Sequence, residues 1–457
     1  MKLIYGIKDR PKFGQIIVFA IQQLLAIMAA TLVVPVIINT SGSMPEGAPA
    51  MSSAAALFGA GVGTLIYQLF TRFKSPVFLG SSFAFIGSMC AAFAGAVSAQ
   101  AGYLGLIIGA AVAGMIYVLI ALVVKLVGVN WIKKLMPAVV IGPTVAIIGL
   151  SLAGNAIGDL QTAPAGGSVY IAILCGLVTL GVTMLCATFG KKMIRLIPFI
   201  MGILAGYAVA AIFTVIGNVA GIDALKVINF APLTNLFTDF GVKSIVALPE
   251  FTFMEAIKGI KDIDGAYLGT VAVAYAPVAL VVFAEHIADH KNLSTIIEQD
   301  LLEEPGLHNT LLGDGVGSMA GAIFGGCPNT TYGESVGCVA ITGNASVVTI
   351  TTTAILAIAI SFLSPFVAFV NTIPSCVMGG VCMALYGFIA VSGLKMIQKV
   401  DLEKNRNLFV VSVILITGIG GLSLSIGKVT LTTIACALIL GILVNVMLGI
   451  KDKKDAE

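Results

Sequence analysis

Three carboxylic acids stand inside apolar stretches of this chain. Glu285 lies within VALVVFAEH, Asp289 follows one helical turn later on the same face, and Glu334 lies in the glycine-broken stretch FGGCPNTTYGESVGCV. Ionised carboxylates only accept hydrogen bonds, so they suit a small polar ligand that carries N–H groups. Desolvation favours the neutral form of a carboxylate, so one of these groups could take up a proton when the site closes. Proton entry would then be linked to ligand entry.

The backbone around Glu334 and around a second stretch, SPVFLGSSFAF, is expected to leave the helical conformation. Non-helical backbone at membrane depth is tolerated where it is buried in protein or lines a cavity. Free N–H groups near Ser82, Phe83, Gly333 and Glu334 could donate to ligand carbonyls. The ring of Phe83 or Tyr332 could pack against a flat ligand. These residues therefore form the predicted substrate site.

The composition predicts an all-α protein that crosses a membrane many times. Of the 457 residues, 58% are hydrophobic and 10% are charged, and the mean hydropathy is +1.06, which excludes a soluble single-core domain. Fourteen apolar runs of roughly membrane-spanning length are predicted at 14–39, 51–71, 77–98, 101–127, 132–153, 168–188, 196–217, 264–289, 309–325, 329–342, 345–370, 373–393, 407–425 and 430–449. The third and tenth are poor continuous helices because proline and glycine interrupt them.

The distribution of positive charge predicts the orientation. With the N-terminus inside, all but five of the 25 Lys and Arg residues fall on the inner side of these segments, as expected for cytoplasmic loops. The exceptions are Lys226, Lys243, Lys258, Lys261 and Lys428. This bias predicts an even number of crossings with both termini cytoplasmic. The long outer connection at 218–263 divides the segments into seven and seven.

Seven segments in each half predict two repeats of opposite orientation. Two short matches occur in the same order: PAVVIG at 137–142 with PSCVMG at 374–379, and SPVFLGSS at 75–82 with NTTYGES at 329–335. Chance similarity of short Pro/Gly patterns in a glycine-rich chain is the alternative. Paired interruptions at corresponding places in two halves are the best sequence indication of a transporter's binding site.

Other ionisable residues in the apolar runs admit structural interpretations. His286 and Asp314 lie within predicted segments, and Asp314, beside Gly313, is expected either to bind substrate or protons or to fix a close helix contact. His290 and Lys291 come near the end of their helix and are expected to reach water. The eight cysteines show no metal-binding spacing and are expected to be small packing residues.

Five motifs along the chain carry a family resemblance. They are LGSSFAF at 79–85, AEHIADH at 284–290, DLLEEPGLH at 300–308, PNTTYGESVG at 328–337 and PSCVMGGVCMALYG at 374–387. In this order and spacing they resemble the nucleobase/ascorbate transporter family, and most closely its bacterial uracil permeases. The likeness extends from QQLLAIMAATLVVPV to the final apolar run.

The resemblance implies a fold of two inverted seven-segment repeats, with short strands in segments three and ten that meet at mid-membrane. It implies a core domain built from 14–127 and 264–370, and a gate domain built from 132–217 and 373–449, with 218–263 as an extracytoplasmic connection. Movement of the core against the gate would give each membrane face access to the substrate in turn.

The resemblance also implies roles for individual residues. Glu285 and Glu334 are expected to accept hydrogen bonds from uracil, the backbone N–H groups of Phe83 and Gly333 to donate, and Tyr386 to contact the base from the gate side. Proton coupling is expected at Glu285, Glu334 and Asp289.

Three positions depart from the family pattern. Asp289 stands where a well-known relative has a histidine. An early Gln-His pair reads Gln22 and Gln23 here, and the asparagine that usually follows the second glutamate is Ser335. These positions bear on the details of proton coupling and on the preference for one base over another.

The function expected from the sequence is proton-coupled import of uracil across the cytoplasmic membrane, without chemical conversion. The expected partners are uracil or a related nucleobase, protons and the lipid bilayer, with a homodimer left open and no cofactor, metal or nucleic acid. A purine or xanthine permease of the same family is the alternative. An anion transporter of the sulfate-carrier fold would need basic or neutral residues at Glu285 and Glu334, and an enzyme would need a nucleophile–base or metal constellation that the sequence does not offer.

Overall fold

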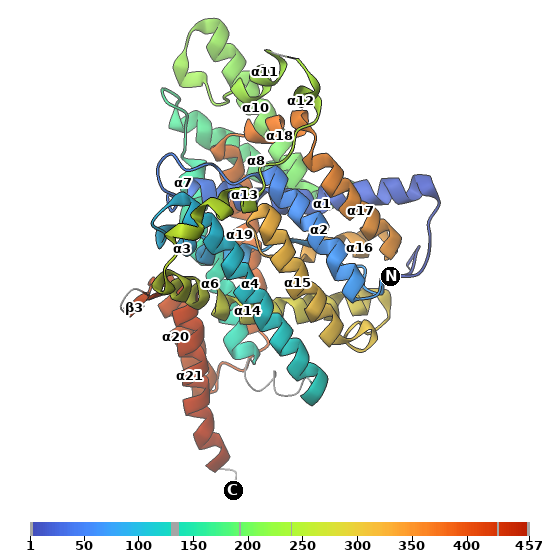
Figure 1. Ribbon diagram of the computed structural model, residues 1–457, viewed down its shortest axis with the longest axis vertical. Coiled ribbons are helices and arrows are strands. Elements are labelled where there is room, and N and C mark those ends of the chain that lie inside the picture. Colours follow the sequence, from blue (N-terminus) through green and yellow to red (C-terminus); the bar gives the residue numbers. More distant parts are fainter. Residues whose placement is uncertain (1–2, 129–136, 192, 239, 427–428, 455–457) are drawn as a thin grey trace.

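The structure is a computed structural model that describes residues 3–128, 137–191, 193–238, 240–426 and 429–454. Residues 132–136 of the fifth predicted segment lie outside this described part. The chain is mostly helical (Figure 1). Within the described residues, eight stretches of helix are long and apolar enough to cross a membrane: α1 (Phe13–Thr40), α2 (Ser53–Phe70), α4 (Ala99–Val127), α6 (Ala138–Ser151) continued by α7 (Ala153–Leu160), α8 (Val169–Phe189), α10 (Pro198–Ala220), α14 (Gly265–Ile297) and α19 (Ser375–Ile397).

Shorter or more polar helices occupy the other predicted segments. They are α3 (Ile86–Ala94) with the 3-10 turn η1 (Phe83–Phe85), α15 (Leu307–Gly325), α16 (Gly333–Thr342), α17 (Val347–Ser361), α20 (Asn405–Ile419) and α21 (Thr433–Lys454). The connections contain α9 (Met193–Leu196), η2 (Asp223–Leu225), α11 (Ala231–Thr238), α12 (Val242–Ile245), α13 (Thr252–Ala256), η3 (Ile257–Asp262), the π-helical turn η4 (Leu302–Gly306) and α18 (Ser364–Asn371). The connection at 218–263 is thus a chain of short helices.

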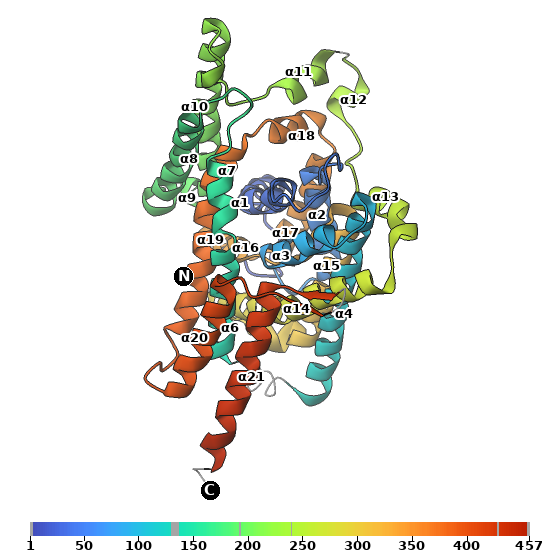
Figure 2. The same ribbon diagram turned by 90° about the vertical axis from the view of Figure 1, so that its left-hand side faces the viewer.

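The helices form two groups that pack mainly within themselves. In the first group α15 lies against α2 and α4, α17 lies against α1 and α2, and α14 lies against α4. In the second group α19 lies against α6, α7 and α8, α10 against α8, and α20 against α6 and α21. Figure 2 shows α2, α4, α15 and α17 to the right of α6, α8, α10 and α19, with α20 and α21 below.

Glycines allow close contact between α2 and α15 in the first group. Gly63 of α2 faces Gly317 of α15, and a Cβ at Gly63 would lie 2.8 Å from the Gly317 carbonyl oxygen. A Cβ at Gly317 would lie 2.7 Å from the Gly63 carbonyl oxygen. Small residues at such positions let membrane helices approach closely, which replaces the hydrophobic driving force that is missing in lipid.

Two short strands cross between segments far apart in the sequence. β1 (Leu79–Ser81) pairs antiparallel with β2 (Asn329–Thr331), with Gly80 opposite Thr330. All residues of both strands are buried. Each strand ends where a helical turn begins, at Phe83 and at Gly333, so the crossing places two helix N-termini within the first group of helices.

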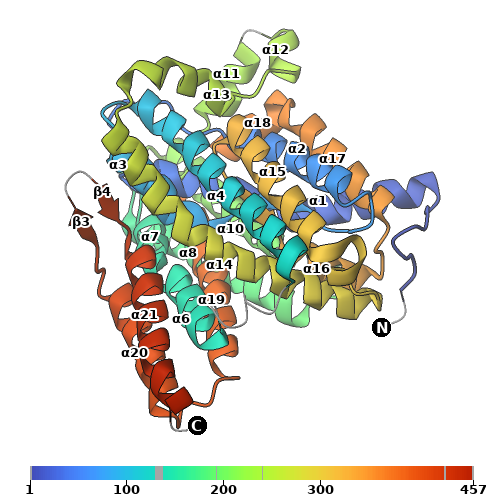
Figure 3. The same ribbon diagram turned by 60° about the horizontal axis from the view of Figure 1, so that its bottom comes forward.

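A second pair of strands was not expected from the sequence. β3 (Leu424–Ile426) and β4 (Val429–Leu431) form an antiparallel hairpin between α20 and α21. Figure 3 shows this hairpin projecting at one edge of the molecule. The hairpin joins the last two helices and lies away from the crossing of β1 and β2.

Candidate substrate-binding site

A cavity of about 460 Å³ lies between the strand crossing, α14 and α19. This volume is within the range of small-molecule sites in proteins. Of the residues predicted to bind substrate or protons, the cavity is lined by Ser82, Phe83, Glu285, Asp289, Tyr332, Gly333 and Glu334. The second group of helices adds apolar side chains and Ser392 of α19. Residues that were predicted from separate stretches of sequence thus meet in one place.

The strand crossing presents backbone N–H groups at this cavity. The ladder continues past both strands, because Ser82 N–H donates to the Pro328 carbonyl at 2.9 Å and Tyr332 N–H donates to the Phe78 carbonyl at 3.3 Å. The next residues, Phe83 and Gly333, begin helical turns, and no side chain caps either turn. First-turn N–H groups have no partner within their own helix, so they are available to a ligand.

Helix α14 supplies two acids to the cavity from the same face. Glu285 and Asp289 are one turn apart and both are half-buried. Asp289 Oδ2 accepts a hydrogen bond from Thr331 Oγ1 at 2.7 Å, which ties α14 to β2. Thr331 also lines the cavity, although no sequence pattern distinguishes it from its neighbours.

Gly333 leaves an open surface beside these acids. It is exposed, and a Cβ placed there would meet only Asp289 Oδ1, at 3.9 Å. Its backbone φ is not positive, so the conformation does not itself require glycine. The missing side chain therefore leaves room for a ligand to approach the first N–H groups of α16.

The aromatic residues take different positions from one another. Tyr332 is buried, and its hydroxyl donates to the Ser81 carbonyl at 2.7 Å. Phe83 is half-buried and lines the cavity. Tyr386 does not line the cavity but lies edge-on to Phe83, with ring centroids 6.3 Å apart. Of these three predicted aromatic residues, Phe83 is thus the one best placed to stack on a ligand.

The expectation that His290 reaches water is wrong. His290 is fully buried, and its Nε2 lies 2.7 Å from the Tyr67 hydroxyl. Its ring stacks on His286, with centroids 4.0 Å apart. The cause is the neighbouring helix α2, whose Tyr67 covers this face of α14. The Tyr67 hydroxyl also forms a hydrogen bond with the Ser75 hydroxyl, at 2.7 Å. Lys291, in contrast, is exposed as expected.

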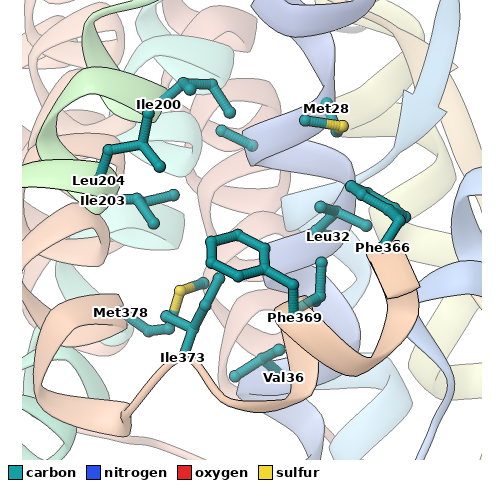
Figure 4. Close-up of a pocket in the computed structure, with 12 residues that line it drawn as sticks. Met28, Leu32, Val36, Ile200, Ile203, Leu204, Phe366, Phe369, Ile373 and Met378 are labelled. Carbon is teal, nitrogen blue, oxygen red and sulfur yellow. The ribbon is translucent and has the colours of Figure 1, made fainter. Parts of the chain in front are cut away.

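A second cavity, of about 180 Å³, is lined only by apolar side chains from α1, α10, α18 and the start of α19 (Figure 4). Figure 4 shows Met28, Leu32, Ile203, Phe366 and Phe369 around it. It offers no side-chain donor or acceptor to a polar ligand.

In the described parts of the chain, no three His, Cys, Asp or Glu side chains are arranged to hold a metal ion.

Comparison with known proteins identifies the family. Residues 14–427 match the sequence pattern of a family described as the permease family. The chain belongs to this family. It is the nucleobase/ascorbate transporter family indicated by the motifs, and the chain is a transporter rather than an enzyme.

Relatives of this permease match over nearly its whole length. It is 36% identical to the uracil permease of Bacillus caldolyticus, covering 98% of this chain and 95% of the relative. It is 35% identical to the uracil permease of Bacillus subtilis, covering 100% and 98%. It is 33% identical to the uracil permease of Escherichia coli K12, covering 96% and 92%.

Solved structures with a similar fold belong to transporters of low sequence identity. The transmembrane domain of the cyanobacterial bicarbonate transporter BicA matches with a TM-score of 0.57 at 14% identity, covering 96% of the permease and 99% of that chain. The murine anion transporter Slc26a9 in its inward-facing state matches with a TM-score of 0.59 at 13% identity, covering 97% and 69%. These similarities establish a shared polytopic helical membrane fold.

Proposed function

We propose that this permease imports uracil together with protons across the cytoplasmic membrane. The observation that carries the proposal is the single cavity at which Glu285, Glu334 and two uncapped helix N-termini meet. Uracil presents N–H donors and carbonyl acceptors on one flat ring. Carboxylates accept from such donors, and helix N–H groups donate to such carbonyls. Relatives named uracil permeases, at 33 to 36% identity, support the same substrate.

Each part of the base has a partner in this proposal. Glu285 and Glu334 accept from the ring N–H groups, and the backbone N–H groups of Phe83 and Gly333 donate to the carbonyls. Phe83 stacks on the ring face. Ser82 Oγ is buried without a hydrogen-bond partner in the described structure, so it is free to bond the base as well. Tyr386 acts from behind Phe83 by supporting the edge of its ring.

Proton coupling follows from the three acids in one partly desolvated cavity. Glu285, Asp289 and Glu334 cannot all remain ionised at close range without a compensating charge, so one of them binds a proton as the cavity closes. A membrane potential of 100 mV supplies roughly 2.3 kcal/mol for each charge moved. One proton therefore supports an accumulation of about fifty-fold, which is adequate for scavenging a dilute base.

The transport movement in this proposal is an elevator-like shift of a core domain against a gate domain. The core comprises 14–127 and 264–370, the gate comprises 132–217 and 373–449, and the two together make fourteen segments in two inverted repeats. The separate packing of the two groups of helices supports this division. The cavity lies between α14 of one group and α19 of the other, so relative movement would change which membrane face it opens to.

In the proposed orientation both termini lie in the cytoplasm, because most Lys and Arg residues lie on the same side of the predicted segments as the termini. A homodimer in the lipid bilayer is compatible with the transport movement. The only support for an anion substrate is the fold that the permease shares with an anion transporter. The two carboxylates in the cavity would repel an anion.

Uptake of labelled uracil by proteoliposomes tests the proposal. We expect uptake that rises when an inward proton gradient is imposed and that unlabelled uracil suppresses more strongly than thymine, xanthine or sulfate. Uptake independent of the gradient would refute proton coupling. Stronger suppression by xanthine would reassign the substrate to a purine, and suppression by sulfate would favour the anion alternative.

A further inference from the structure

Asp314 and His286 form a buried pair outside the cavity. Asp314 Oδ2 lies 2.7 Å from His286 Nδ1, and the two side chains are 1% and 0% exposed. On the other side of the ring, His286 Nε2 lies 3.0 Å from Thr310 Oγ1. Neither member of the pair lines the cavity. The pair is therefore a second set of titratable side chains that the proposed site does not use.

The hydrogen bonds around His286 determine how many protons the pair holds. The Thr310 hydroxyl donates to the Leu307 carbonyl at 3.0 Å, so its oxygen accepts from a proton on His286 Nε2. The 2.7 Å contact between Nδ1 and Asp314 Oδ2 then needs one more proton, because two lone pairs do not bond each other. Whether the ring or the carboxyl holds this proton, the pair as a whole is neutral.

Loss of that proton would produce a different arrangement. The ring proton would have to move to Nδ1 to serve Asp314, and the Thr310 hydroxyl would have to turn from Leu307 to Nε2. The pair would then carry one net negative charge. Asp314 Oδ1 is buried without a hydrogen-bond partner among the described residues, so little would stabilise this charge. The pair thus has two distinct states that differ by one proton.

Among the described residues, two aromatic rings from α4 and α14 lie against the pair. From α4, Tyr117 lies with its ring centroid 6.3 Å from that of His286. From α14, His290 stacks on His286, and its Nδ1 lies 2.8 Å from the His286 carbonyl oxygen. Nδ1 therefore carries a proton, and a neutral His290 accepts at Nε2 from the hydroxyl of Tyr67 on α2, 2.7 Å away. His290 is neutral in this arrangement, so the charge of the pair is set by its own proton.

We propose that Asp314 and His286 together hold a second transported proton, in addition to the one bound at the cavity. The inference rests on the proton coupling proposed above. Glu285 directly precedes His286 on α14, and Asp289 follows three residues later, so one stretch of helix carries both the cavity acids and the pair. In the proposed movement α14 and α15 shift together with the rest of the core, so the pair travels with the cavity acids from one side of the membrane towards the other.

The number of protons carried per uracil tests this proposal. At zero membrane potential, a pH difference of one unit balances an accumulation ratio of about tenfold for one proton and about a hundredfold for two. Asp314→Asn keeps an amide that bonds His286 but has no titratable proton. We expect its accumulation ratio in proteoliposomes to be about tenfold below that of the wild type, with uracil–uracil counterflow retained.

Asp264→Asn is the matched control. Asp264 caps the N-terminus of the same helix by accepting from Tyr267 N–H at 2.7 Å, and asparagine is an equally good N-cap. Its accumulation ratio should equal that of the wild type. His286→Gln is a second variant, because its amide accepts from a protonated Asp314 while donating to Thr310. It should show the same loss as Asp314→Asn.

An unchanged accumulation ratio in both variants would overturn the proposal. The proposal would also be overturned if both variants lost counterflow as well as accumulation, because the pair would then be needed for the substrate site itself. Loss of all gradient dependence with counterflow intact would also overturn it, because this pair would then be the sole coupled proton site and not a second one. A wild-type accumulation ratio that does not depend on the proton gradient would instead refute the proposed coupling. If the protein transports another base, the accumulation ratio of that base is measured in the same variants.

Discussion

Gln23 Nε2 donates a hydrogen bond to Ser335 Oγ at 2.5 Å, although the two residues are 312 positions apart. Both are positions at which the resemblance predicts a departure from the family pattern, and the two positions meet in space. Gln23 is 3% exposed and Ser335 is fully buried. Ser335 Oγ also accepts from the Phe78 N–H at 3.3 Å. The residue next to Glu334 is thereby fixed to α1 and to the approach to β1.

Removing this hydroxyl should destabilise the protein. Ser335→Ala leaves the Gln23 amide and the Phe78 N–H without their acceptor, and a buried unpaired polar group costs about 1–3 kcal/mol. We expect the free energy of unfolding in detergent to fall by about that amount. In the double variant Gln23→Leu/Ser335→Ala the loss should be smaller than the sum of the single losses. Strict additivity would show that the two side chains do not interact.

A methyl group at Gly333 should weaken binding without harming the fold. The added Cβ would meet no protein atom closer than 3.9 Å and would occupy the space next to the α16 N-terminus. We expect Gly333→Ala to lower uracil affinity by about tenfold, or 1.4 kcal/mol, in calorimetric titration. The contrasting variant is Gly80→Ala, whose Cβ would run into the Tyr332 ring and should lower stability. Wild-type affinity in Gly333→Ala would place the base elsewhere.

Asp289 should influence the pH dependence of transport. Replacing it with histidine substitutes a base with an ordinary pKa of about 6.5 for a carboxyl group. We expect Asp289→His to bind uracil but to shift the pH profile of its initial uptake rate. The companion variant Thr331→Val removes the donor to Asp289 Oδ2 and should shift the profile as well. An unchanged profile in Asp289→His would leave Asp289 only its structural bond to Thr331.

An ion pair between two connections should make stability depend on pH. Lys74, after α2, lowers the pKa of Glu304 in η4 through a hydrogen bond of 2.7 Å and through its charge. Because the pKa of Glu304 is lower in the folded state, the ion pair stabilises the fold at a pH above the unfolded-state pKa of about 4.3. This stabilisation is lost as the pH falls through the folded-state pKa of Glu304. Lys74→Met should therefore lower the thermal midpoint slightly at pH 7 but not at the acid end of the titration. A difference independent of pH would exclude this cause.

The sequence predicted the parts of the site that local pattern determines. Long apolar runs identify the helices, glycine and proline mark the interruptions near Gly80 and Gly333, and a charge inside an apolar run singles out Glu285 and Glu334. The structure has strands and helix starts within those same interrupted stretches. What joins them, the pairing of Gly80 with Thr330, is a contact between distant segments that no single stretch contains.

The contacts that the sequence missed depend on how helices are rotated against one another. His290 was expected in water because it is polar and near the end of an apolar run, yet Tyr67 from another helix covers it. The pairing of His286 with Asp314 likewise requires the relative rotation of α14 and α15. A hydrophobic pattern specifies such rotation poorly when a helix is apolar on all sides.

The initial rate of labelled uracil uptake in proteoliposomes containing Glu285→Gln or Glu334→Gln tests the placement of the substrate site most directly. Each change removes the carboxylate that accepts from the base while keeping nearly the same side-chain volume. Glu250→Gln, on the outer connection, is the control. Uptake should be abolished or severely reduced in both cavity variants, whereas their thermal midpoints and the uptake by the control should equal those of the wild type. Normal uptake by either cavity variant would contradict the placement of the site.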